Sequence, residues 1–243
     1  MADFKTHVLG AALVSGVVAT GMAMVSQVSP QMIIGYFLLG VVGGILPDID
    51  SDSSIPTRMA FTVASVLGAF MMVFYFARAL SLIELVLLGL VTYAVVRHGL
   101  FTVMTQFTRH RGVIHSIPAG VFAGLLAVLI ADRVFAAQIT TAWTVGVFVC
   151  MGFLVHLLLD EFYSVDMRGM KVKKSFGTAF SLGTLSNPLG TAGLYLGVAA
   201  LYSLCPPIHG FAYGLVNGHW QQLVWERLWP NGSWFAAVWA VVQ

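Results

Sequence analysis

Long uncharged apolar runs alternate along this chain with short polar breaks. Residues 6–47 contain no charged side chain, and a helix needs only about 20 apolar residues to cross a hydrocarbon core about 30 Å thick. The pattern predicts an all-α fold, a polytopic transmembrane helical bundle of about seven spans. The predicted spans are residues 8–28, 31–46, 59–77, 81–97, 117–132, 140–159 and 189–205.

The composition excludes a water-soluble protein. Only 9% of the residues are charged and 58% are hydrophobic, whereas a soluble domain of this size carries roughly 25% charged residues. The first run is too long for a removable signal peptide, lacks a basic start and is followed at once by a second span. With a net charge of +2 and no long basic run, no nucleic-acid partner is expected. Cys150 and Cys205 are expected to be small apolar residues, not a disulfide or a metal site.

The C-terminal segment, residues 206–243, differs from the domain formed by residues 1–205. It contains five of the six tryptophans, and tryptophan favours the membrane–water interface. We therefore expect an interfacial segment here, with a short eighth span over 233–243 as the alternative.

The basic residues predict the orientation. If the N-terminus lies in the cytoplasm, nine basic residues fall inside and three outside, which agrees with the positive-inside rule. The inside set is Lys5, Arg58, Arg97, Arg109, Arg111, Arg168, Lys171, Lys173 and Lys174, and the outside set is Arg78, Arg133 and Arg227. A bacterial-type inner membrane with a cytoplasmic N-terminus is the predicted location.

This topology brings histidines and aspartates from four parts of the chain to the cytoplasmic side of the membrane. They are His7, Asp48, Asp50, Asp52, His110, His115, His156 and Asp160. A single histidine at a span end is usually interfacial, and a loop aspartate is usually solvated. Their joint placement at one level instead favours function, because polar residues near lipid are costly.

The spacing of these residues favours a metal site. His156 and Asp160 are four residues apart, so on a helix they share a face, and an extended PDIDSD segment would point Asp48, Asp50 and Asp52 to one side. Imidazole with carboxylate suits zinc, manganese or iron better than calcium. The number of donors exceeds one tetrahedral site, so two or more ions are expected, and paired ions suit phosphoester hydrolysis.

Four motifs carry a family resemblance: KTHVLGA, ILPDIDSD, HRGVIHS and HLLLDEF, within residues 5–178. In this order the chain resembles the YdjM-like family of membrane-bound metal-dependent hydrolases, also described as LexA-binding and inner-membrane-associated. That family is more remotely similar to zinc-dependent phospholipases C and single-strand nucleases. The sequence departs from the family pattern at Asp52, where many relatives have histidine, and after Asp160, where others have Thr-x-x-Gly.

The resemblance implies roles for individual residues. The implied metal ligands are His7, Asp48, Asp50, His110, His115, His156 and Asp160. From their chemistry and position, apart from the resemblance, Asp50 or Asp52 would act as a ligand, a bridge between ions or a general base, while Arg111 and Lys174 would bind a substrate phosphate. For both cations the alternative is a simple role in orienting the chain or attracting anionic lipid.

Together these observations predict a membrane-integrated hydrolase that uses a divalent metal, zinc or manganese. Its expected substrate is a phosphoester, lipid-borne because the site opens at the membrane, on the cytoplasmic face. Two alternatives come from other classes: an ion- or proton-coupled transporter, and a non-enzymatic scaffold that binds a cytoplasmic protein. Transport would favour ionisable residues near the bilayer midplane, whereas here they lie at one end of the spans.

Overall fold

The computed structural model describes most of the helical part of the chain. The described residues are 3–25, 28–50, 62, 65, 66, 68, 69, 72, 73, 82–100, 113, 115–166, 171, 172, 181–183, 187–218, 220, 222 and 226.

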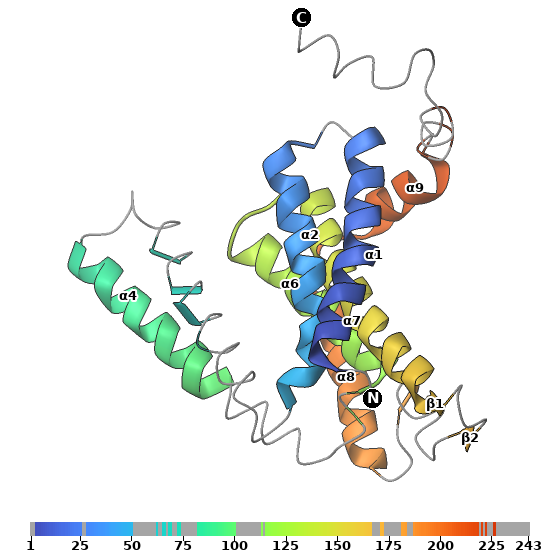
Figure 1. Ribbon diagram of the computed structural model, residues 1–243. Helices are drawn as coiled ribbons and strands as arrows, with labels where there is room; N and C mark the ends of the chain where they lie inside the picture. The colour runs from blue at the N-terminus through green and yellow to red at the C-terminus, as the bar shows by residue number, and fades with distance from the viewer. Residues whose placement is uncertain are drawn as a thin grey trace, which may run out of the picture.

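These residues form a helical bundle with one minimal strand pair (Figure 1). The α-helices are α1 (Phe4–Val25), α2 (Pro30–Ile45), α4 (Leu82–Ala94), α6 (Ile117–Arg133), α7 (Ile139–Ser164), α8 (Pro188–Leu204) and α9 (His209–Asn217). A 3₁₀ helix, η1 (Leu46–Asp50), extends α2, and a π-helix, η2 (Val95–Leu100), extends α4. Strands β1 (Val165–Asp166) and β2 (Lys171–Val172) pair antiparallel after α7. The predicted all-helical architecture is confirmed.

Proline and short polar residues define where several helices begin. Ser29 precedes α2 and its hydroxyl accepts a hydrogen bond from the Met32 amide. Asn187 precedes α8 and caps the Gly190 amide in the same way at 2.9 Å. Prolines occupy the first turn of α2, α6 and α8, where the missing N–H has no intrahelical partner to lose.

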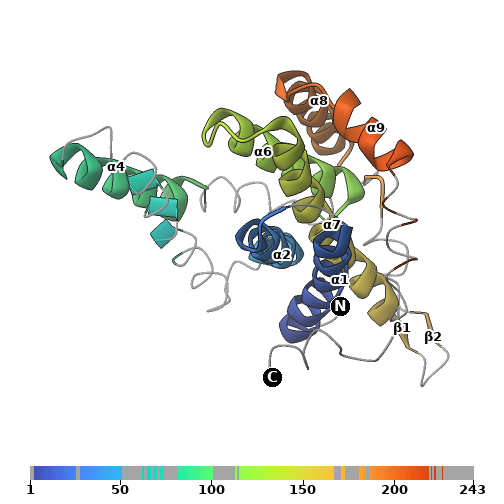
Figure 2. The same ribbon diagram turned by 90° about the horizontal axis from the view of Figure 1, so that it is seen from above.

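Helix α7 lies at the centre of the bundle and packs against α1, α2 and α6 (Figure 2). Glycines allow its backbone to approach its neighbours closely. A Cβ on Gly152 of α7 would overlap the carbonyl oxygen of Gly40 on α2, and a Cβ on Gly43 would overlap that of Val149. Small residues at such contacts are the usual means of close helix packing in membranes.

The outward faces of the helices are apolar, as a lipid-facing surface requires. Leu9, Leu13 and Val17 on α1 are exposed, as are Ile34 and Leu38 on α2. Within the part of the chain that the structure describes, three helices are long and apolar enough to cross a membrane: Phe4–Met24, Pro30–Asp48 and Ile139–Ser164. The pair Pro188–Leu204 and His209–Val216, bent by 94°, adds a fourth if it forms one span.

Some sequence-based expectations lie beyond this description. The described residues within the predicted span 59–77 are helical, but most of that span falls outside the described residues, so the count of seven spans stays a prediction. Helix α4 stands apart from the bundle (Figures 1 and 2). The alternative span at 233–243 also lies outside the described residues, and the division at residue 206 stays a prediction.

Candidate metal centre

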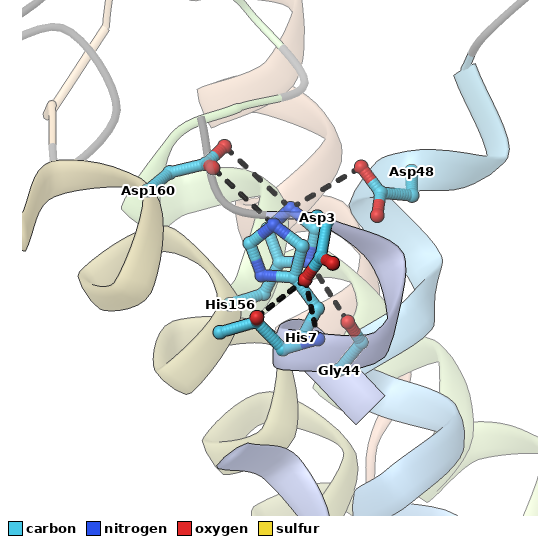
Figure 3. A network of polar contacts seen from close by, with 7 residues as sticks. Asp3, His7, Gly44, Asp48, His156 and Asp160 are labelled. Carbon is cyan, nitrogen blue, oxygen red and sulfur yellow. Dashed lines mark hydrogen bonds and ion pairs between the residues drawn. The ribbon is translucent and has the colours of Figure 1, made fainter. Parts of the chain in front are cut away.

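The polar residues meet at one end of the bundle, where α1 and α6 begin and α2 and α7 end. We call this the site end. Five predicted ligand residues lie together there, and we refer to them as the polar cluster: His7, Asp48, His115, His156 and Asp160. Figure 3 shows four of them reaching inward from α1, α7 and the end of α2.

His7 reaches the cluster because α1 begins only a few residues before it. Asp3 accepts hydrogen bonds from the amide and hydroxyl of Thr6 and so caps the first turn. The amide of His7 then donates to the Asp3 carbonyl at 3.1 Å. The imidazole is buried, with Nε2 3.2 Å from a carboxylate oxygen of Asp160. The cap therefore fixes the start of α1, and with it the position from which the His7 side chain reaches the polar cluster.

His156 and Asp160 occupy one face of α7, and both are buried. Nε2 of His156 lies 3.7 Å from an Asp160 oxygen, as the four-residue spacing predicts. The ring stacks on His7 with centroids 3.6 Å apart. On its other side, Nδ1 is 2.8 Å from the Gly44 carbonyl oxygen.

The bond to Gly44 settles the tautomer of His156. A carbonyl oxygen only accepts, so in the neutral ring Nδ1 carries the hydrogen and Nε2 carries the lone pair. That nitrogen faces carboxylate oxygens of Asp48 at 3.6 Å and Asp160 at 3.7 Å, and it has no hydrogen-bond partner among the described residues. A buried lone pair facing two carboxylates is unfavourable unless a cation lies among them.

Asp48 enters the cluster from η1, the 3₁₀ turn that ends α2. The expected extended conformation of PDIDSD is therefore wrong over residues 47–50, which lie in this 3₁₀ helix. The amide of Leu46 bonds to the carbonyls of Gly43 and Val42, and tight turns of this kind satisfy the free carbonyls at a helix end. The Asp48 side chain is 28% exposed, in contrast to 1% for Asp160.

His115 approaches from the segment just before α6. Its ring centroid is 5.9 Å from that of His156, edge to face. Ser116 follows it and pairs with Ser181 ahead of α8, where the Ile117 amide donates to the Ser181 carbonyl at 2.9 Å. Burial lowers the pKa of His115 below its usual range, outweighing the carboxylates of Asp160 and Asp48. A neutral imidazole is the form that binds metal.

The donor set fits a divalent transition metal. Two groups of three have ligand atoms within 4.8 Å of one another: His7, His156 and Asp160 in one, and Asp48, His115 and His156 in the other. Donors about 2.0–2.2 Å from one zinc ion lie roughly 3–4 Å apart, which matches the separations of 3.2, 3.6 and 3.7 Å. Nitrogen with carboxylate oxygen suits zinc or manganese.

Both groups share His156, which limits how many ions the described residues can hold. Its Nδ1 is engaged with Gly44, so only Nε2 is available, and one nitrogen lone pair binds one ion. The expectation of two or more ions would thus require additional ligands. The remaining predicted site residues lie outside the described residues: Asp52, His110, Arg111, Lys174 and the side chain of Asp50.

Two contributors to the site were missing from the sequence-based prediction. Asp3 acts through its cap on α1, and the Asp-x-x-Thr spacing before an apolar run was a usable signal. Gly44 acts through its backbone carbonyl, which no side-chain motif reveals.

The comparison with known families agrees with the motifs described above. The family model described as YdjM inner membrane protein matches residues 1–240. No curated protein and no solved structure matches the chain. Because the match spans nearly the whole sequence, the chain belongs to the YdjM family of inner membrane proteins.

Proposed function

We propose that this protein is a membrane-integrated, metal-dependent hydrolase whose site lies at the cytoplasmic face. The observation that carries the proposal is the buried Nε2 of His156, which faces the carboxylates of Asp48 and Asp160 and has no hydrogen-bond partner among the described residues. Leaving such an atom buried costs about 1–3 kcal/mol. A bound divalent ion would remove this penalty.

The residues of the polar cluster divide into two kinds by exposure. His7, His156 and Asp160 are buried and stacked or paired with each other, so they would hold the ion. Asp48 is partly exposed, so it would face water and substrate. His115 is partly exposed as a residue, but its Nε2 is buried, so it would be a further ligand. When bound, the metal would supply Lewis acidity, which can lower the pKa of a coordinated water to about 7.

A phosphoester is the substrate class that this arrangement supports best. Asp48 lies at one end of a bundle whose outward side chains are apolar. If these side chains face lipid, the site lies at the level of the lipid headgroups, where a lipid-borne phosphoester would reach it. Asp50 or Asp52 would act as general base, and Arg111 and Lys174 would bind the phosphate. The placement of the cluster at one end of the helices favours hydrolysis over an ion pathway, which needs groups near the midplane.

Metal analysis and a substrate screen test this proposal together. The wild-type protein is purified in detergent, its zinc and manganese are measured, and phosphodiesters and phospholipids are tested as substrates. We expect bound metal and hydrolysis in the wild type, and loss of both in His156→Ala and Asp160→Ala. His209→Ala removes an exposed histidine at the start of α9 and should leave both unchanged. Equal metal in all variants would contradict the proposal.

A further inference from the structure

Gly44 contributes a backbone carbonyl to the polar cluster instead of a side chain. This oxygen lies 2.8 Å from Nδ1 of His156, and both residues are buried. Metal-bound histidines commonly donate their second N–H to an oxygen, which fixes the tautomer and the orientation of the ring. Here the bond leaves the lone pair of Nε2 directed at Asp48 and Asp160 (Figure 3).

The absence of a side chain at Gly44 is as important as its carbonyl. A Cβ at this position would overlap the Cβ of Ala11 on α1 and lie 3.4 Å from the carbonyl oxygen of Gly152 on α7. Ala11 is completely buried and follows His7 by one helical turn. The face of α1 that stacks His7 on His156 thus also presses Ala11 against Gly44.

We propose that Gly44 is a positioning residue for the metal centre. Its carbonyl selects Nε2 of His156 as the ligand atom, and its lack of a side chain lets α1 and α2 approach closely enough for that bond to form. This inference rests on the metal site of the proposed function. It goes further by assigning a role to a glycine that never touches the ion.

The proposed role of the missing side chain at Gly44 can be tested by moving one methyl group from Ala11 on α1 to Gly44 on α2. In Gly44→Ala the new methyl would collide with that of Ala11, move α2 away and lengthen the bond to His156. We expect zinc affinity to fall about 10- to 100-fold, the range found when outer-shell partners are lost. The double variant Ala11→Gly/Gly44→Ala removes the collision and should recover most of the loss.

Gly35→Ala is the matched control, because on the same helix a Cβ there would meet nothing within 4 Å. Affinity is measured with zinc alone, competed against a chromophoric chelator, in detergent. Unchanged affinity in Gly44→Ala, or a loss that Ala11→Gly does not reverse, would overturn the inference while leaving the proposed function intact. No zinc binding by the wild type would instead refute the proposed function, and this inference with it.

A second measurement needs no variant at Gly44 and remains decisive if that variant fails to fold. Nitrogen NMR of metal-free wild-type protein, labelled with ¹⁵N-histidine, reports which ring nitrogen carries the hydrogen. The His156 signals are assigned by their loss in His156→Gln. We expect the hydrogen on Nδ1 and none on Nε2. A hydrogen on Nε2 would overturn the role assigned to the Gly44 carbonyl.

Discussion

The two ends of α7 hold polar groups in opposite situations. Where the helix begins, Nε1 of Trp143 donates to the Pro206 carbonyl at 3.2 Å, and Nη2 of Arg133 on α6 donates to the Leu204 carbonyl at 3.2 Å. Where it ends, Nε2 of His115 and of His156 are buried without a hydrogen-bond partner among the described residues. At the site end, therefore, Nε2 of each of these two histidines lacks a partner among the described residues, although Nδ1 of His156 is bonded to the Gly44 carbonyl.

This contrast separates polar groups that stabilise the fold from groups held ready for a ligand. Trp143 and Arg133 tie neighbouring segments together through backbone carbonyls. For the buried Trp143 this is the usual way in which a side-chain donor is satisfied, whereas Arg133 is largely exposed. The imidazole of His156 is as deeply buried as Trp143, yet its Nε2 faces the carboxylates of Asp48 and Asp160 and has no hydrogen-bond partner among the described residues. We infer that the unpaired polar groups at the site end lower the free energy of unfolding, and that a bound cation would raise it.

Of the substitutions that test this contrast, Asp160→Asn should cause the largest loss of zinc affinity. The substitution keeps the shape of the side chain but removes its negative charge from the buried cluster. We expect zinc affinity to fall more than about 100-fold, beyond the range for outer-shell changes. Asp132→Asn is the control, because Asp132 pairs with the exposed Arg133 near the opposite end of the bundle. Similar zinc titrations for the two variants would contradict the assignment.

Metal should stabilise the wild type against heat. Zinc at about 100 times its dissociation constant adds roughly 2.7 kcal/mol to the free energy of unfolding, and a chelator should reverse the gain. Thermal unfolding in detergent, followed by intrinsic fluorescence, measures both. The shift should vanish in Asp160→Asn but persist in Trp143→Phe. A shift that survives in Asp160→Asn would place the stabilising ion elsewhere.

Asp48→Asn should have a smaller effect than Asp160→Asn. Its carboxylate is 28% exposed, so water can take over part of its contribution. We expect about a tenfold loss of zinc affinity, the lower end of the range found when outer-shell partners are lost, measured by the same titration. A loss as large as that of Asp160→Asn would show that exposure does not separate the two carboxylates.

Trp143→Phe should have the smallest effect and act on stability alone. It removes the hydrogen bond to Pro206 while keeping most of the buried ring. We expect a loss of about 1 kcal/mol in the free energy of unfolding, typical of one hydrogen bond, with zinc affinity unchanged. Denaturant titration of the two proteins, with and without zinc, checks both parts.

Hydropathy predicted the helices well because each span must be apolar along its length. The helix ends were predicted less accurately. Helix α1 begins at Phe4, ahead of the predicted residue 8, because Asp3 caps it, and α7 continues to Ser164, past the predicted residue 159, while still packed in the bundle. Hydropathy averages over a window and does not register a single capping residue.

The gathering of the polar cluster was predictable from topology, whereas its detailed geometry was not. Alternating spans alone place His7, His115 and His156 at one level. The tautomer of His156 depends instead on how closely α1, α2 and α7 approach at Ala11, Gly44 and Gly152. Gly44 lies 33 positions from Ala11 and more than 100 from Gly152 and His156, so these contacts leave no local pattern in the sequence.

X-ray absorption at the zinc edge of the loaded wild-type protein examines the ligand set itself. We predict a shell of nitrogen and oxygen at about 2.0–2.2 Å, with outer-shell scattering from at least two imidazoles, and loss of imidazole scattering in His156→Ala. An all-oxygen shell, or a spectrum that His156→Ala leaves unchanged, would show that histidines and aspartates of the polar cluster do not share an ion.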